Sequence, residues 1–129
     1  MLRLRCTQKV LKELGGTPAP EDVPEAGDSV LGDWYVNLFT VDRRKTFLFM
    51  NEKTLLSFVI YGIKKSNVQQ MPLAFVRGLA QLLELEGLPE PAIRRALVGT
   101  ELVMLARTDS RRLLGNLNDL VSMYRHAIL

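Results

Sequence analysis

Hydrophobic residues follow a strand-like pattern between positions 33 and 61, and the rest of the chain is organised around this stretch. Both the odd and the even positions from 34 to 41 are mostly apolar, which predicts a strand covered on both faces. Asp42 begins a polar turn, since its side chain can bond the backbone two residues on, and residues 51–53 form a second turn. The stretch therefore predicts an antiparallel meander of three strands, at 34–41, 45–50 and 54–61.

Shorter patterns predict the elements around the meander. Leu2, Leu4 and Cys6 alternate with Arg3 and Arg5, which predicts a strand at 2–6 with one buried face. Residues 101–106 predict a late strand, and apolar spacing predicts four helices, at 8–14, 72–86, 89–97 and from 111 onwards. The order β-α-β-β-β-α-α-β-α predicts an α+β fold with a mainly antiparallel sheet around a central meander.

Three residues inside these elements are expected to serve packing. Trp34 opens the meander and is expected to anchor the core, because a large aromatic side chain in an apolar strand is usually buried. Gly78 and Gly115 lie within predicted helices, where glycine is a poor helix former. We expect both glycines to allow close approach of a neighbouring element.

The composition indicates one soluble domain over residues 1–129 with an acidic, proline-rich loop at about 17–32. The loop holds three prolines and four acids, and is interpreted as a mobile, solubilising segment or a functional one. The chain has one cysteine, Cys6, and its apolar runs are too short to span a membrane. We therefore expect a cytoplasmic protein without membrane contact.

The net charge of +3 conceals an uneven distribution. Seven acids and no Lys or Arg lie between Glu13 and Asp42, while basic residues cluster at 43–45, 64–65, 94–95 and 107–112. Such a distribution could steer an anionic partner towards a basic side, or could simply keep the surface solvated. Nucleic acid is the less favoured partner, because no helix-turn-helix is present and the strands look too apolar for an open RNA platform.

Several enzyme classes do not fit the sequence. His126 is the only histidine, which leaves no two-histidine metal site, and neither a nucleophile elbow nor a phosphate-binding glycine loop occurs. The sequence thus predicts no catalytic residue, no metal and no cofactor.

The segment from 106 to 112 is the richest polar cluster, where a strand passes into a helix. Free N–H groups at a helix N-terminus can hold an anion, and Arg111 would add charge-assisted hydrogen bonds. Thr108 and Ser110 could equally cap the helix, with the arginines in solvent. Both interpretations stay open at this point.

Polar residues elsewhere suggest a second part to such a site. Asn37 lies inside an apolar strand, so its amide needs a partner if it is buried. The helix that carries Asn118 and Asp119 is one candidate for that partner. If the late strand pairs beside the meander, the 108–112 turn would lie near Asn37 or the Asp42 hairpin, and these groups would form one polar site with Asn118 and Asp119. The competing interpretation is a hydrogen-bond network that locks helix to sheet.

The motifs DWYVNL at 33–38, DRRK at 42–45, NEKTL at 51–55 and TDSRRLLGNLND at 108–119, with RCTQK at 5–9, cover nearly the whole chain. On these motifs the chain resembles an uncharacterised bacterial family of small stand-alone proteins with a domain of unknown function. The resemblance implies no activity and no catalytic residues. It draws attention to polar positions that a bare scaffold does not need, and these are the candidate ligand-binding residues: Asn37, Asp42, Arg43, Arg44, Thr108, Ser110, Arg111, Asn118 and Asp119.

From the sequence we expect a non-catalytic binding or regulatory protein with an anionic or protein partner, which includes a second copy of itself. The alternative is a small enzyme that acts on nucleic acid or a phosphorylated substrate through the arginine-rich turn.

Overall fold

The computed structural model describes residues 2–15, 31–100 and 103–128. It confirms the α+β class and the predicted order of elements, with one short 3₁₀ helix added before the second helix. In chain order the elements are β1 (Leu2–Cys6), α1 (Gln8–Leu14), β2 (Trp34–Val41), β3 (Arg44–Asn51), β4 (Ser57–Ile63), the 3₁₀ helix η1 (Lys65–Gln70), α2 (Met71–Leu85), α3 (Glu90–Ala96), β5 (Val103–Arg107) and α4 (Arg111–Ile128). The acidic loop expected at about 17–32 lies almost entirely outside the described residues.

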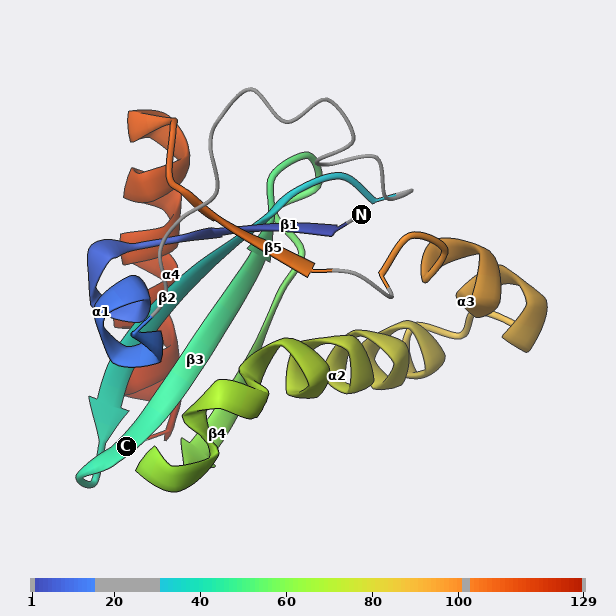
Figure 1. Cartoon of the computed structure of the whole chain (residues 1–129). Helices are drawn as coiled ribbons and strands as arrows, with labels where there is room; N and C mark the ends of the chain where they lie inside the picture. The colour runs from blue at the N-terminus through green and yellow to red at the C-terminus, as the bar shows by residue number, and fades with distance from the viewer. Residues whose placement is uncertain (1, 16–30, 101–102, 129) are drawn as a thin grey trace.

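The five strands form one mixed sheet in the order β4-β3-β2-β1-β5 (Figure 1). The meander of β2, β3 and β4 is antiparallel, whereas β1 pairs in parallel with β2 on one side and with β5 on the other. The meander therefore builds one half of the sheet, and β2 occupies its middle. This position explains why β2 is apolar on both faces.

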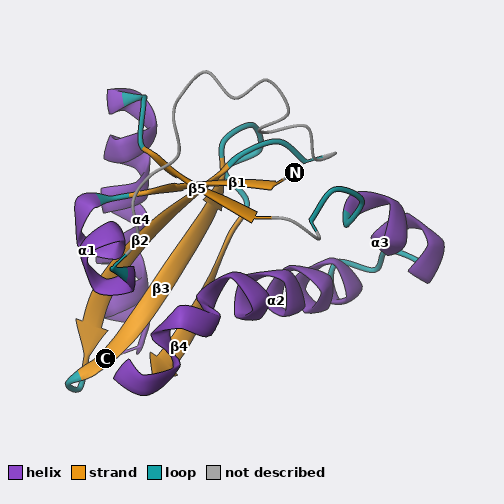
Figure 2. Ribbon diagram, in the orientation of Figure 1, coloured by secondary structure: helices purple, strands orange, loops and turns teal. Residues whose placement is uncertain are grey.

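Helices cover both faces of the sheet (Figure 2). The larger core lies on the face that α1, α2 and α3 cover, and α4 alone packs on the opposite face against β2 and β3. Trp34 is 1% exposed in the larger core, as expected, and its ring meets Phe75 edge-on with 5.2 Å between ring centroids. The described helices include none that is long and apolar enough to cross a membrane.

The two helical glycines differ from each other. A Cβ atom added to Gly78 would lie 2.7 Å from Cε2 of Phe58, so the absence of a side chain lets α2 approach β4. A Cβ atom on Gly115 would meet nothing within 4 Å, apart from α4's own backbone. The expectation of close packing is therefore confirmed for Gly78 and wrong for Gly115, which lies on an exposed part of α4.

Two local predictions need correction. Strand β4 begins at Ser57 rather than Thr54, because Asn51 holds the preceding residues in a longer turn: its side-chain oxygen accepts hydrogen bonds from the backbone N–H groups of Lys53 and Thr54. Strand β1 is also buried on both faces rather than one. Arg5 is only 7% exposed, since ion-pair partners reach it from other parts of the chain.

Candidate functional site

A buried polar network surrounds Arg5, and all three guanidinium nitrogens of this residue are engaged. Nε donates to Oδ2 of Asp33 at 3.1 Å, and Nη1 donates to the backbone oxygen of Arg107 at 2.9 Å. Nη2 lies 3.3 Å from Oδ2 of Asp109. Arg3 also donates from Nη1 to Oδ2 of Asp33, at 3.1 Å. Because β1 lies between β2 and β5, Arg5 can bind both neighbours at once.

Tyr35 extends this network to the start of α4. Its hydroxyl donates to the carboxylate of Asp109, and the backbone N–H of Asp109 donates to the hydroxyl oxygen at 3.3 Å. Burial raises the pKa of Tyr35 from 10.0 to about 12, with the hydrogen bond to Asp109 acting in the same direction. The phenol is therefore neutral at physiological pH. These contacts tie the last helix to the sheet.

In the turn between β5 and α4, the side chain of Ser110 caps the helix. The Oγ atom of Ser110 accepts a hydrogen bond from the backbone N–H of Leu113 at 3.2 Å, which is the geometry of an N-cap. Thr108 is half-buried, whereas Arg107, Arg111 and Arg112 are exposed. The carboxylate of Asp109 brings a negative charge beside the helix N-terminus, where an anionic ligand would otherwise gain from the helix dipole.

Asn37 is buried, and its hydrogen-bond partners come from its own strand and from Thr7, which follows β1. Its Oδ1 accepts hydrogen bonds from the backbone N–H of Leu38 at 2.8 Å and from Oγ1 of Thr7 at 3.1 Å. The expected partner, the helix with Asn118 and Asp119, does not supply these bonds. Both residues are exposed on α4, and Asp119 lines a separate hollow of about 240 Å³ with Asn116, Met50 and Leu55.

The structure does not bring the candidate residues into one site. Strand β5 pairs with β1 and not beside the meander, so the 108–112 turn lies near Tyr35. The Asp42 turn is seven residues further along the same strand direction, which places it about 20 Å away. In Figure 1 the β2–β3 turn and the beginning of α4 lie at opposite ends of the molecule.

The β2–β3 turn carries Asp42 and Arg43 in left-handed backbone conformations, with φ of 51° and 65°. A two-residue hairpin of type I′ requires positive φ at both central positions, where glycine and asparagine are the usual residues. Arginine is unusual at such a position because its Cβ atom crowds the backbone. Strain of this kind concentrates at functional sites.

Beside this turn lies a cavity of about 360 Å³ with a strongly basic lining, made of Arg43, Arg44, Lys45, Gly62, Ile63 and Lys64. Gly62 has a φ of 78°, which favours glycine, and a Cβ atom added there would make ordinary van der Waals contact with Cδ of Arg44 at 3.6 Å. Lys45 forms an ion pair with Glu13 of α1. Among the described residues, Arg43, Arg44 and Lys64 have no ion-pair partner.

A second cavity, of about 450 Å³, continues this surface on the other side of Lys45, where Lys9 and Lys12 of α1 line it. We call the six cations Lys9, Lys12, Arg43, Arg44, Lys45 and Lys64 the basic hairpin surface. Sequence reasoning selected only Arg43 and Arg44 of these, although it noted the cluster at 64–65. The missing signal was the strand register, because the pairing of Lys45 with Ile63 brings the two clusters together.

Two acids from the acidic part of the sequence form ion pairs within the protein. Glu13 binds Lys45, and Asp33 binds Arg3 and Arg5. The acidic segment therefore contributes less negative charge to the protein surface than its sequence suggests. Within the described ranges, no three His, Cys, Asp or Glu side chains gather closely enough to hold a metal ion.

Comparison with known proteins confirms the expectation of a domain of unknown function. Neither the curated proteins nor the solved structures gave a match. The sequence profile of DUF6933, a domain of unknown function, matches residues 3–129. Because this match covers almost the entire sequence, the chain belongs to the DUF6933 family.

Proposed function

We propose that this protein is a non-catalytic binding or regulatory protein, and that its basic hairpin surface binds a ligand that carries phosphate groups. The observation that carries the proposal is the cavity beside the β2–β3 turn, where four of the six lining residues are cationic. Arg43, Arg44 and Lys64 lack ion-pair partners among the described residues. Like charges held this closely repel one another, and an anion relieves that repulsion.

The chemistry of the lining favours phosphate over a single carboxylate. Arginine presents a planar fork of donors that fits phosphate oxygens, and lysine adds a compact charge. The cavity of about 360 Å³ has room for a group of nucleotide-phosphate size. Its continuation towards Lys9 and Lys12 would let a longer polyanion lie across both cavities.

The same lining supports binding rather than turnover. The cavity beside the β2–β3 turn holds no carboxylate, hydroxyl, thiol or imidazole that would serve as a nucleophile or general base. The second cavity is lined by Thr40 and by Glu13, whose carboxylate is paired with Lys45. The alternative of a small enzyme that acts through the 108–112 turn gains less support. There, Asp109 is engaged by Arg5 and Tyr35, and Ser110 caps α4.

Titration calorimetry at low salt would test the proposal with three probes: inorganic pyrophosphate, ATP and a short single-stranded oligonucleotide. We expect binding of at least one probe, and the double variant Arg44→Gln/Lys64→Gln should weaken it about tenfold or more. Arg95→Gln on α3 is the matched control, since Arg95 is also exposed but lies outside the basic hairpin surface. Arg111→Gln tests the turn in the same assay.

The probes separate the sources of the phosphate. If the oligonucleotide binds and each lost cation lowers the salt dependence of its affinity, the ligand is a nucleic acid. If ATP or pyrophosphate binds better, the ligand is a small phosphate compound. Absence of binding to all three probes, or binding that only Arg111→Gln weakens, would overturn the proposal.

A further inference from the structure

Strand β4 forms one edge of the sheet and pairs only with β3 among the described strands. Its sequence, SFVIYGI, contains neither a charged residue nor a proline. Natural proteins usually protect an exposed edge strand with such residues, because unpaired backbone groups attract other strands. Nothing in the side chains of β4 therefore opposes the addition of a further strand.

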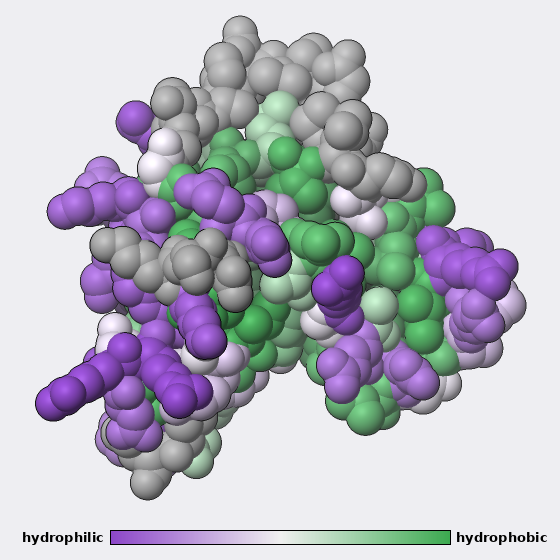
Figure 3. Space-filling model, turned by 60° about the horizontal axis from the view of Figure 1, so that its bottom comes forward, coloured by the Kyte–Doolittle hydropathy of each residue, from purple (hydrophilic) through white to green (hydrophobic). Residues whose placement is uncertain are grey.

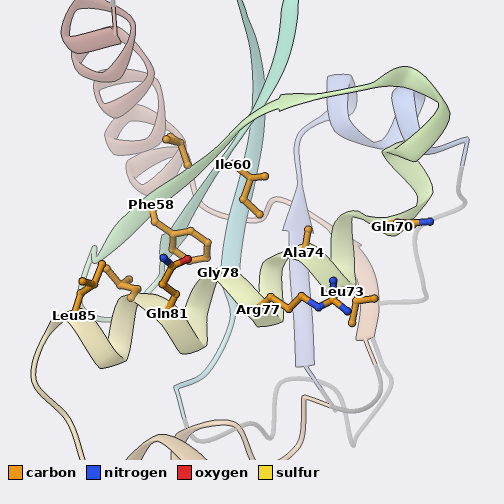
Figure 4. Close-up of a pocket in the computed structure, with 11 residues that line it drawn as sticks. Phe58, Ile60, Gln70, Leu73, Ala74, Arg77, Gly78, Gln81 and Leu85 are labelled. Atoms are coloured by element: carbon orange, nitrogen blue, oxygen red, sulfur yellow. The ribbon is translucent and has the colours of Figure 1, made fainter.

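Helix α2 extends the recognition surface beyond this edge. Gly78 lets the helix pack against Phe58, and a groove of about 550 Å³ lies between the outer flank of α2 and the strand. Figure 4 shows Leu73, Arg77, Gln81 and Leu85 following one another along α2, with Phe58 between the helix and β4. In Figure 3 hydrophobic surface lies in a hollow between two hydrophilic sides of the molecule.

The flank of α2 is complementary to itself. Leu73 and Leu85 are 53% and 78% exposed and stand at its two ends, with Arg77 and Gln81 between them at intervals of four residues. This spacing places the four side chains along one side of the helix. The order of side chains along the flank is apolar, polar, polar, apolar. This order is the same in both directions, so an antiparallel second copy would present the same pattern.

Charge complementarity points in the same direction. Arg77 is the only charged residue in the lining of the groove, and Glu84 lies seven positions further along the helix, on the same flank. Arg77 and Glu84 are both exposed, and neither has an ion-pair partner among the described residues. An antiparallel copy of α2 would place Glu84 of the second copy near Arg77, and the reverse pair would form at the same time.

From these observations we propose that the groove between β4 and α2 is the interface of a symmetric dimer. The β4 strands of two copies pair antiparallel across a two-fold axis, which joins the two sheets into one. Leu73 of each copy packs against Leu85 of the other, and Arg77 contacts Gln81 and Glu84 of the other. Two-fold dimers are the commonest assemblies of identical chains, and their interfaces must match themselves in this way.

Sedimentation velocity of the full chain over a range of concentrations would test the dimer. We expect a species of twice the chain mass of 14.6 kDa that dissociates on dilution. Leu73→Glu and Arg77→Glu should each shift the species to the monomer, with the far-ultraviolet circular dichroism unchanged and cooperative unfolding retained at a lower melting temperature, because dimerisation stabilises the folded chain. The charge swap Arg77→Glu/Glu84→Arg should restore the dimer, because it recreates the reciprocal ion pairs with opposite signs.

Val98→Glu is the matched control for Leu73→Glu. Val98 is 58% exposed and lies outside the groove, so this substitution should leave the dimer intact. A monomer at all concentrations would overturn the proposal, and so would a dimer that the groove variants leave unchanged. A monomer that instead binds an extended segment of another protein through the same groove would also overturn it.

Discussion

The side chains of Tyr35 and Asp109 are hydrogen-bonded to each other, although 74 positions separate them in the sequence. Arg5 binds the same carboxylate group through its Nη2 atom. Three segments, β1, β2 and the start of α4, therefore meet at Asp109, whose side chain is half exposed while Arg5 and Tyr35 are buried. The network fixes where the last helix begins relative to the sheet.

Replacement of Arg5 by methionine should destabilise the protein by about 3 kcal/mol, because Asp33 loses one of its two arginine partners and the Arg107 carbonyl loses its hydrogen bond from Arg5. The remaining contact from Arg3 to Asp33 keeps the loss near the lower end for a broken buried pair. Urea unfolding, followed by the fluorescence of the buried Trp34, measures this change.

Arg107→Met is the matched control, because the Arg107 side chain is exposed and only its backbone oxygen serves the network. It should change stability by less than about 0.5 kcal/mol. A similar cost for both variants would contradict a specific role for the Arg5 guanidinium.

The element order could be predicted from the sequence, because the signals that define it are local. A run of residues that are apolar on both faces marked β2, and the predicted end of α1 at Leu14 is followed by Gly15, which adopts a left-handed cap. The strand order could not be predicted in the same way. The position of β1 between β2 and β5 depends on contacts between residues about a hundred positions apart, which leave no local pattern.

The same limit explains what happened to the candidate site. The alternation of residues 2–6 places Arg3 and Arg5 on one face, but an arginine destined for solvent and one destined for a buried ion pair look identical in sequence. Arg5 is buried because Asp33, which lies 28 positions away in the sequence, provides its ion-pair partner. Among the selected residues, Arg43 and Arg44 do line one cavity, since adjacent residues in a tight turn cannot separate.

The two helical glycines should respond to alanine in opposite directions. Gly115→Ala should stabilise the protein by about 1 kcal/mol, because the helix gains propensity and the new methyl group meets no neighbour. Gly78→Ala should destabilise it by about 1 to 2 kcal/mol, since crowding against Phe58 exceeds the same gain in propensity. Thermal unfolding of the two variants side by side measures both effects. Equal shifts would contradict the observed packing of α2.

Cys6 should be unreactive in the folded protein. It is 1% exposed, and burial raises the pKa of its thiol from 9.0 to about 12, so the reactive thiolate is scarce at neutral pH. Iodoacetamide at pH 8 should label it only after urea is added. Rapid labelling without urea would show that β1 opens in the native state.

Stability should fall as the pH rises from about 9 to about 12. Cys6 and Tyr35 both have a raised pKa, so the folded protein retains protons that the unfolded chain releases in this window. Their contribution is complete below pH 9 and is lost as the pH passes their folded pKa values. Urea unfolding across this range should show a shallower decline for Tyr35→Phe, which removes one of the two groups.

Asn37 and Thr7 should behave as a coupled pair in a double-mutant cycle. Asn37→Ala should cost about 1 to 2 kcal/mol, because it leaves the buried N–H of Leu38 without an acceptor. Once Asn37 is absent, Thr7→Val should cost less than it does alone, since its acceptor is already gone. Asn118→Ala on the exposed side of α4 is the control and should change stability little. Additive effects at positions 7 and 37 would contradict the bond.

The place of β1 between β2 and β5 has a consequence for the order of events during synthesis. Leu2 pairs with Val103 of β5, so the edge of β1 that faces β5 stays unpaired until most of the chain has left the ribosome. During that interval its free backbone groups would attract strands of neighbouring nascent chains. Charged side chains on an edge strand discourage such pairing, because a foreign strand would have to bury them. We therefore expect Arg3 and Arg5 to hinder such pairing in the unfinished chain, before the Arg107 carbonyl and the Asp109 carboxylate become available to Arg5.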